Sequence, residues 1–180
     1  MMIRVNRFNL YLVLTLAVVC GCQTEEGRKK RQITSLEIHL EADRDKPDLN
    51  ELVSISRDHP IPISVQKTPF LTEAFLDKAE LVDVMGGFAI RIHFARQGTW
   101  LLEQYSTANR GKHLAIFSRF VVPPGDKLNA GRWLAAPKIT QRIADGTLTF
   151  TPDASREEAD QIVLGLKNIA RQLTKNSKAL

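Results

Sequence analysis

The chain has 180 residues, of which 43% are hydrophobic and 25% are charged, and its formal net charge is +5 at pH 7. This length and apolar content suit one globular domain with a substantial core. Its two cysteines, Cys20 and Cys22, lie close together near the N-terminus. We therefore expect no disulfide, no thiolate nucleophile and no cysteine-ligated zinc in the folded region.

The N-terminal segment has the layout of a secretory signal. Arg4 and Arg7 supply a positive start, and an apolar run over residues 10–19 follows. A bilayer-spanning helix needs about 20 apolar residues, so this shorter run predicts a signal peptide. The sequence becomes polar abruptly at Gln23.

Residues 19–22, Val-Cys-Gly-Cys, resemble a lipobox, the cleavage and lipidation signal of bacterial envelope lipoproteins. The small residue Gly21 favours Cys22 as the lipidated cysteine, with residues 1–21 as the signal peptide. Such a cysteine carries two or more acyl chains, palmitate among them, which give stable anchoring where one chain does not. An ordinary secretory signal and an uncleaved membrane anchor are the alternatives.

The lipobox resemblance implies a lipid-anchored protein of the bacterial cell envelope that faces the periplasm. Gln23 stands where lipoproteins retained at the inner membrane tend to have aspartate, and this favours the outer membrane. Residues 22–32 then form the lipidated cysteine and a charged tether. The basic run at residues 28–31 has no interleaved aromatic residues, so it does not predict nucleic-acid binding. We interpret it as solvated, with anionic headgroups as the alternative partner.

Residues 33–67 predict an N-terminal β segment. Leu36, Ile38 and Leu40 alternate with polar residues, which indicates a half-buried strand. Residues 52–56 and 61–66 predict two more strands after a loop. The pattern leaves open whether this segment joins the main sheet or forms a layer of its own.

Residues 68–175 predict the main domain. Its expected elements are a turn into a short helix at residues 70–76 with Thr72 as N-cap, a hairpin of residues 81–84 and 88–94, a helix over residues 98–109 with a glycine cap at Gly111, and a strand over residues 113–122. A loop over residues 123–132, apolar sequence over residues 133–139 and a strand at residues 148–150 follow. Ser155 and Glu158 match a capping box that opens a long amphipathic helix.

Two helices over a mainly antiparallel sheet make an α+β sandwich. The order of elements favours a ferredoxin-like topology with both main helices on one face, plus the N-terminal β segment.

Six short segments of the main domain resemble, in the same order, the head subdomain of the first periplasmic domain of SecD and SecDF. TPFLTEA resembles the family segment P-x-LT-x-A, NRGKHLAI resembles N-x-GK-x-LAI, and AAPKI resembles SAP-x-I. FAIRIHF resembles the strand that follows the first of these, IADG resembles I-x-GG, and SREEA resembles [FS]-x-EEA. These segments occupy residues 68–74, 88–94, 109–116, 135–139, 143–146 and 155–159.

The resemblance implies a ferredoxin-like module that works as an accessory to the Sec translocon and contacts polypeptides crossing the membrane. The chain departs from the family in having no block of predicted transmembrane helices and in carrying the loop at residues 123–132. We therefore expect a head-like module on a lipid anchor that binds Sec components or a translocating polypeptide in protein transport. A structural or interaction lipoprotein of the envelope, unrelated to Sec translocation, is the alternative.

The titratable residues form no recognised catalytic or metal-binding pattern. His39, His59, His93 and His113 lack metal-ligand spacing, and no nucleophile elbow, P-loop or dinucleotide motif is present. We predict no enzyme activity, no metal and no small-molecule cofactor; an uncharacterised hydrolase is a third hypothesis.

Trp100 and Trp133 are the candidate partner-binding residues, because tryptophan often anchors interfaces, although filling a core is its commoner role. A sheet edge is a further possible site, where an extended peptide adds as a strand.

Overall fold

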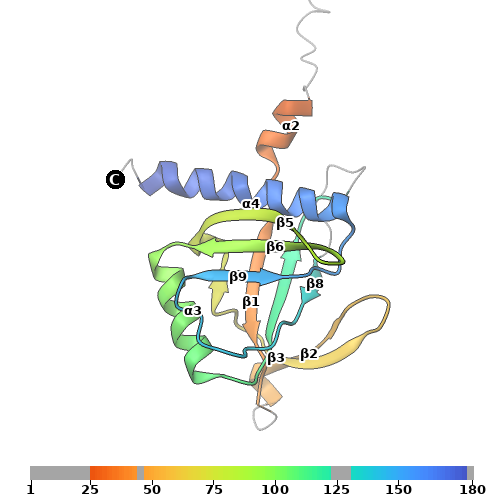
Figure 1. Ribbon diagram of the computed structural model, residues 1–180, viewed down its shortest axis with the longest axis vertical. Coiled ribbons are helices and arrows are strands. Elements are labelled where there is room, and N and C mark those ends of the chain that lie inside the picture. The colour runs from red at the N-terminus through yellow and green to blue at the C-terminus, as the bar shows by residue number, and fades with distance from the viewer. Residues whose placement is uncertain (1–24, 44–46, 123–130, 178–180) are drawn as a thin grey trace, which may run out of the picture. The chain divides into compact units, whose positions relative to one another are not determined.

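The computed structural model describes residues 25–43, 47–122 and 131–177 (Figure 1). The chain divides into two units, Met1–Lys30 and Arg31–Leu180. Every strand that the structure describes belongs to the second unit. The predicted lipidation site, Cys22, lies outside the described residues.

Helix α2, Glu25–Arg31, occupies most of the segment that was predicted to be a charged tether. The sequence predicted a charged tether here and did not predict a helix. Acidic residues begin the helix and basic residues end it, an order that the helix dipole favours. Glutamate, lysine and arginine are also good helix formers, so a charged composition is compatible with a short helix here.

The larger sheet has four antiparallel strands in the order β4-β1-β7-β8. They are β1 (Ser35–Leu40), β4 (Leu71–Thr72), β7 (Leu114–Arg119) and β8 (Arg132–Ala135). In this sheet β1 pairs with β4 on one side and with β7 on the other, with Ile38 opposite both Leu71 and Ile116. The first strand of the N-terminal β segment is therefore central to the main sheet.

Two smaller antiparallel sheets complete the β structure. The three-stranded sheet has the order β5-β6-β9 and consists of β5 (Leu76–Val84), β6 (Gly87–Phe94) and β9 (Thr147–Phe150). The two-stranded sheet is a hairpin of β2 (Asn50–Ile55) and β3 (Ile61–Gln66), which follows a 3-10 turn, η1 (Pro47–Leu49). The N-terminal segment thus does both things that the sequence left open, since β1 joins the main sheet and β2 and β3 form their own.

The predicted α+β class with antiparallel strands is confirmed. The arrangement differs in detail from one ferredoxin-like sheet with two helices on one face, because the strands divide among three sheets. Leu36 and Ile38 of β1 are hydrophobic and have no exposed surface. They require a place inside the core, so residues 33–67 and 68–175 share one folded unit.

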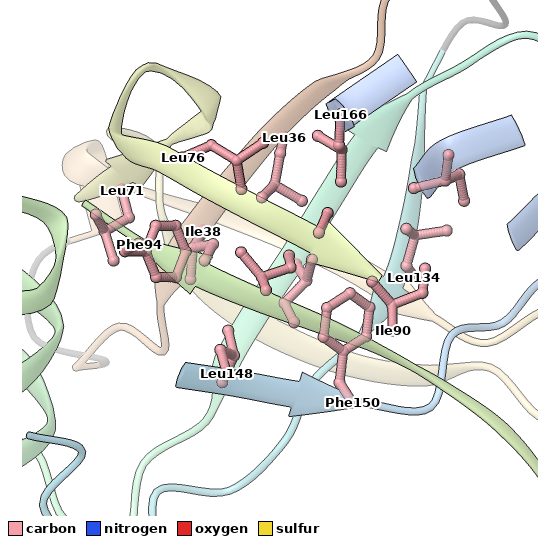
Figure 2. Packing of buried hydrophobic residues seen from close by; sticks show 14 of the residues in the cluster. Leu36, Ile38, Leu71, Leu76, Ile90, Phe94, Leu134, Leu148, Phe150 and Leu166 are labelled. Atoms are coloured by element: carbon pink, nitrogen blue, oxygen red, sulfur yellow. The ribbon is translucent and has the colours of Figure 1, made fainter. Parts of the chain in front are cut away.

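The core lies between the two larger sheets and beneath the C-terminal helix. Figure 1 shows β6 and β9 crossing in front of β1, and Figure 2 shows the side chains that meet between them. Ile38 from β1, Ile90 from β6, Phe150 from β9 and Leu166 from the C-terminal helix belong to one buried cluster. A second, smaller cluster lies under the β2–β3 hairpin and includes Val65.

The long C-terminal helix, α4 (Arg156–Ser177), begins as its sequence predicted. The Ser155 N–H donates to Glu158 Oε2 at 2.9 Å, and the Glu158 N–H donates to Ser155 Oγ at 3.2 Å, which is a capping box. One face of α4 is buried, mainly against β5. The other main helix, α3 (Arg96–Ala108), has Asn109 as its C-cap. Gly111 has the predicted left-handed conformation, with a φ of +89°, but its N–H donates to the Ile139 carbonyl at 2.8 Å and it does not cap the helix.

The segment predicted as a turn into a short helix is shorter than expected. Thr72 does cap it, since the Ala74 N–H donates to Thr72 Oγ1 at 3.4 Å, but the element is one 3-10 turn, η2 (Glu73–Phe75). It ends there because Leu76 already pairs with Phe94 in the β5–β6 ladder.

The loop predicted at residues 123–132 lies outside the described residues up to position 130, and Arg132 begins β8.

No helix in the described ranges combines the length and the apolar character that crossing a membrane requires.

Candidate functional site

A groove lies where strands of two different sheets, β8 and β9, come together. Strand β8 is the last strand of the four-stranded sheet, and β9 is the last strand of the three-stranded sheet (Figure 1). The hollow has a volume of about 710 Å³ and is lined by Ile55 and Ser56, Val84 and Ala89, residues 134–137 and residues 149–153. We call this hollow the edge groove.

Strand β9 directs backbone hydrogen-bonding groups toward the edge groove. The Phe94 N–H donates to the Gly146 carbonyl at 2.9 Å, and the same register pairs Ile92 with Leu148 and Ile90 with Phe150. Since bonded and non-bonded pairs alternate in an antiparallel ladder, Thr149 lies between bonded pairs. Its N–H and C=O therefore point away from β6, toward the unpaired edge of β9, and Thr149 itself lines the groove.

The two edges meet at one end of the edge groove. The Asp153 N–H donates to the Leu134 carbonyl at 2.7 Å, which ties the segment after β9 to β8. The edge groove is therefore closed at the Asp153 end by this hydrogen bond. Proline follows both edge strands, as Pro137 after β8 and Pro152 after β9, and proline cannot donate to a sheet ladder.

The β2–β3 hairpin forms one wall of the edge groove and is tied to the start of α4. The Arg57 N–H and Nε donate to Asp153 Oδ2 at 3.0 and 3.2 Å, and an Arg57 guanidinium nitrogen lies 3.7 Å from Glu158 Oε2. Ser56 adopts a φ of +70°, a left-handed conformation that costs a non-glycine residue about 1 kcal/mol. This strained residue lies between the hairpin strand and the ion pairs that hold it.

Glu158, which contacts Arg57 of the hairpin, also links to the edge strand β8. Arg132 donates to Glu158 Oε2 at 2.9 Å. Burial opposes the ionisation of Glu158, but hydrogen bonds from Arg132 and from the Ser155 N–H outweigh it and hold the pKa of Glu158 below its usual range. The carboxylate is therefore ionised at neutral pH and links three elements at this end of the groove.

The lining of the edge groove is small and mostly uncharged. Alanine, threonine, proline and aliphatic residues predominate, and the single charged side chain, Asp153, is paired with Arg57. Small side chains leave room for those of a ligand, and an apolar lining disfavours buried charges that lack a partner. These properties, together with the outward backbone groups of Thr149, suit an extended polypeptide.

The structure separates the two tryptophans that the sequence singled out. Trp133 is half-buried in the second core cluster, with its ring centroid 5.1 Å from those of His39 and Phe117. Trp100 is 60% exposed on α3, beside the ion pair of Glu103 and Arg142. Neither tryptophan lines the edge groove within the described part of the chain.

His39 and His113 occupy structural positions. His39 is buried, and its Nδ1 lies 2.8 Å from the Gln66 carbonyl oxygen. His113 Nδ1 lies 2.7 Å from Glu41 Oε2. Among residues 25–43, 47–122 and 131–177, no group of three or more histidine, cysteine, aspartate or glutamate side chains is placed to hold a metal ion.

Sequence reasoning named a sheet edge as a possible site without identifying the strand. The edge groove combines residues from four separate parts of the chain, and no local pattern connects them. The sequence signal that could have identified the edge strands is the proline that follows each of them, Pro137 and Pro152. Proline has no N–H to donate, so within sheets it is confined mostly to edge strands and strand ends.

Comparisons with known proteins agree on one family. A family model described as the SecDF P1 head subdomain matches residues 50–170, a region that includes both edge strands. A solved structure of SecDF, described as a membrane component that enhances protein export, is 25% identical with a TM-score of 0.53, covering 83% of this chain and 71% of that one. A crystal structure of SecDF in a super-membrane-facing form is 24% identical with a TM-score of 0.52, covering 81% of this chain and 21% of that one. No curated protein matches.

Proposed function

The chain belongs to the SecDF P1 head subdomain family, and from that premise we propose that it binds extended polypeptide in the edge groove as an accessory to protein export. The observation that carries the proposal is the outward-facing backbone of Thr149 beside an uncharged groove. The similarity to a SecDF that enhances protein export supports the biological setting.

Strand addition to β9 explains how the edge groove would recognise a polypeptide without reading one sequence. A peptide strand beside β9 exchanges hydrogen bonds with the N–H and C=O of Thr149 and then enters the groove past Thr151. Main-chain bonds supply affinity for any extended segment, and the small residues Ala89 and Ala136 accommodate its side chains. This mode suits a module that meets many different polypeptides.

We expect Thr149→Pro to weaken binding of an extended peptide at least tenfold while leaving the fold intact. Proline removes the N–H that faces the edge groove, and about 1.4 kcal/mol corresponds to tenfold in affinity. The bonds of β9 to β6 come from the neighbouring residues Leu148 and Phe150, so the sheet survives. Fluorescence anisotropy with a labelled peptide and the full chain measures the loss.

Thr149→Val is the matched control, because it changes the side chain and keeps the N–H. It is expected to bind like the wild type. Equal binding by Thr149→Pro and Thr149→Val, with unchanged circular dichroism, would rule out strand addition at β9.

Crosslinking in membranes from a photoreactive residue at Thr151 tests the export setting. Sec components or unfolded clients support it, and recovery of unrelated envelope proteins alone favours a general interaction lipoprotein.

We further propose that Cys22 is lipidated and holds the domain at the periplasmic face of an envelope membrane, with the outer membrane favoured by Gln23. The basis is the sequence alone, namely the apolar run, Gly21 and Cys22 in lipobox order. Mass spectrometry of the mature N-terminus is expected to show an acylated cysteine at position 22. Cys22→Ser should move the protein out of the membrane fraction, and retention of that variant in membranes would argue for an uncleaved anchor.

A further inference from the structure

A cluster of basic side chains continues the edge groove across the outer face of the β5–β6–β9 sheet. Lys78, Arg91 and His93 surround Glu80 there, and we call these four residues the basic patch. Lys78 Nζ lies 2.7 Å from Glu80 Oε2, Arg91 Nη1 lies 3.3 Å from Glu80 Oε1, and His93 Nε2 lies 3.7 Å from the same oxygen. The basic patch draws on two strands, β5 and β6, of the sheet whose third strand borders the groove.

The sheet register places the basic patch directly beside the groove. Arg91 is opposite Glu80 on one side and opposite Thr149 on the other, and His93 is likewise opposite Lys78 and Thr147. Side chains two residues apart on a strand share a face, so Ala89, Arg91 and His93 lie in one row. Ala89 and Thr149 line the edge groove. The groove and the basic patch are therefore one continuous surface.

The basic patch has an excess of positive charge. One carboxylate, Glu80, faces two cations, Lys78 and Arg91, so these three side chains have a net charge of +1. The side chains of Lys78 and Arg91 are 59% and 41% exposed, and the guanidinium makes one hydrogen bond, at 3.3 Å, within the described residues. Arginine has five donor hydrogens, which leaves several for a ligand. Asp145 approaches only the far end of the face, where its Oδ1 accepts from the Thr147 N–H at 3.1 Å.

The geometry points to a polypeptide segment that carries a glutamate at the position opposite Thr149, with its carboxylate held by Arg91. This inference rests on the proposed binding of an extended peptide beside β9. Adjacent strands lie about 4.8 Å apart, so the added strand would lie roughly 10 Å from β6, with β9 between them. Glutamate and arginine side chains together reach over the short Thr149 side chain. The part of the peptide two residues farther along contacts the uncharged edge groove.

The test compares two labelled peptides of alternating valine and threonine, one with a central glutamate and one with glutamine in its place, on the full chain. We expect the glutamate peptide to bind about three- to tenfold more tightly at low salt, because an exposed charge pair contributes modestly. The preference should shrink as the salt concentration rises. Arg91→Gln should abolish the preference and leave the affinity for the glutamine peptide unchanged.

Arg142→Gln is the matched control, since Arg142 is an exposed arginine paired with a glutamate on α3, away from the groove lining. It should retain the preference, and Lys78→Gln should reduce it if Arg91→Gln does not fold. Equal binding of both peptides, with no effect of Arg91→Gln or Lys78→Gln, would overturn the inference and leave the proposed peptide binding standing. Binding of neither peptide would overturn both.

Discussion

Replacing Ile38 by alanine is expected to lower the free energy of unfolding by about 2–5 kcal/mol. Ile38 has no exposed surface and lies in β1, an inner strand of the four-stranded sheet, opposite Leu71 on β4 and Ile116 on β7. The shortened side chain would leave a cavity that the surrounding sheet cannot close. Urea unfolding followed by circular dichroism measures the change.

The matched control is Leu52→Ala on the β2–β3 hairpin. Leu52 is 74% exposed, so its truncation should change the free energy of unfolding by no more than about 0.5 kcal/mol. The comparison asks whether β1, which precedes the region matched by the family model, is an integral part of the fold. Similar values for the two variants would mean that β1 is dispensable.

Gly165→Ala is expected to destabilise the protein by about 1–3 kcal/mol, although alanine is the better helix former by about 1 kcal/mol. A Cβ at position 165 would lie 2.8 Å from Thr34 Cβ and 2.9 Å from the backbone carbon of Ile33, and closer still to the Thr34 hydroxyl. These distances are shorter than van der Waals contact, and part of the obstacle is backbone. Helix α4 would have to move away from the chain that leads into β1.

The effect of Gly165→Ala is measured as a shift in the urea midpoint. Lys167→Ala, on the exposed side of the same helix, controls for helix propensity and should leave the midpoint nearly unchanged. Two hydrogen bonds hold the same junction, from Asn168 Nδ2 to the Gln32 carbonyl at 2.9 Å and from Gln32 Nε2 to Gln161 Oε1 at 2.7 Å. A stabilised Gly165→Ala variant would contradict this close packing.

The edge groove contains sheet edges that are short and partly covered, as is common in proteins with β-sheets. Unpaired edges invite pairing with other chains, and most proteins shorten or cover them. Here β8 and β9 are four residues each, and a hydrogen bond from Asp153 joins them at one end. The remaining exposed edge, around Thr149, is confined to a groove. A short, walled edge permits transient pairing with a peptide while limiting association between copies.

Local sequence was sufficient to predict those elements that local forces determine. The capping box of Ser155 and Glu158 and the β5–β6 hairpin were both confirmed, because capping and turn chemistry act over a few residues. The SecDF head resemblance was also readable from short motifs in order, and the family comparison confirms it. Helix α2 at Glu25–Arg31 was not predicted, because composition alone did not distinguish a charged helix from a charged tether.

Apart from the β5–β6 hairpin, tertiary structure decided which strands lie together and where a site forms. The alternation of Leu36, Ile38 and Leu40 predicted a strand, but its place between β4 and β7 depends on partners that lie 33 residues or more away in the chain. The edge groove exists because β8 and β9 end separate sheets, and the basic patch adjoins it because register sets Arg91 opposite Thr149. Periodicity specifies which face of a strand is buried, whereas pairing partners and sheet edges follow from how the whole core packs.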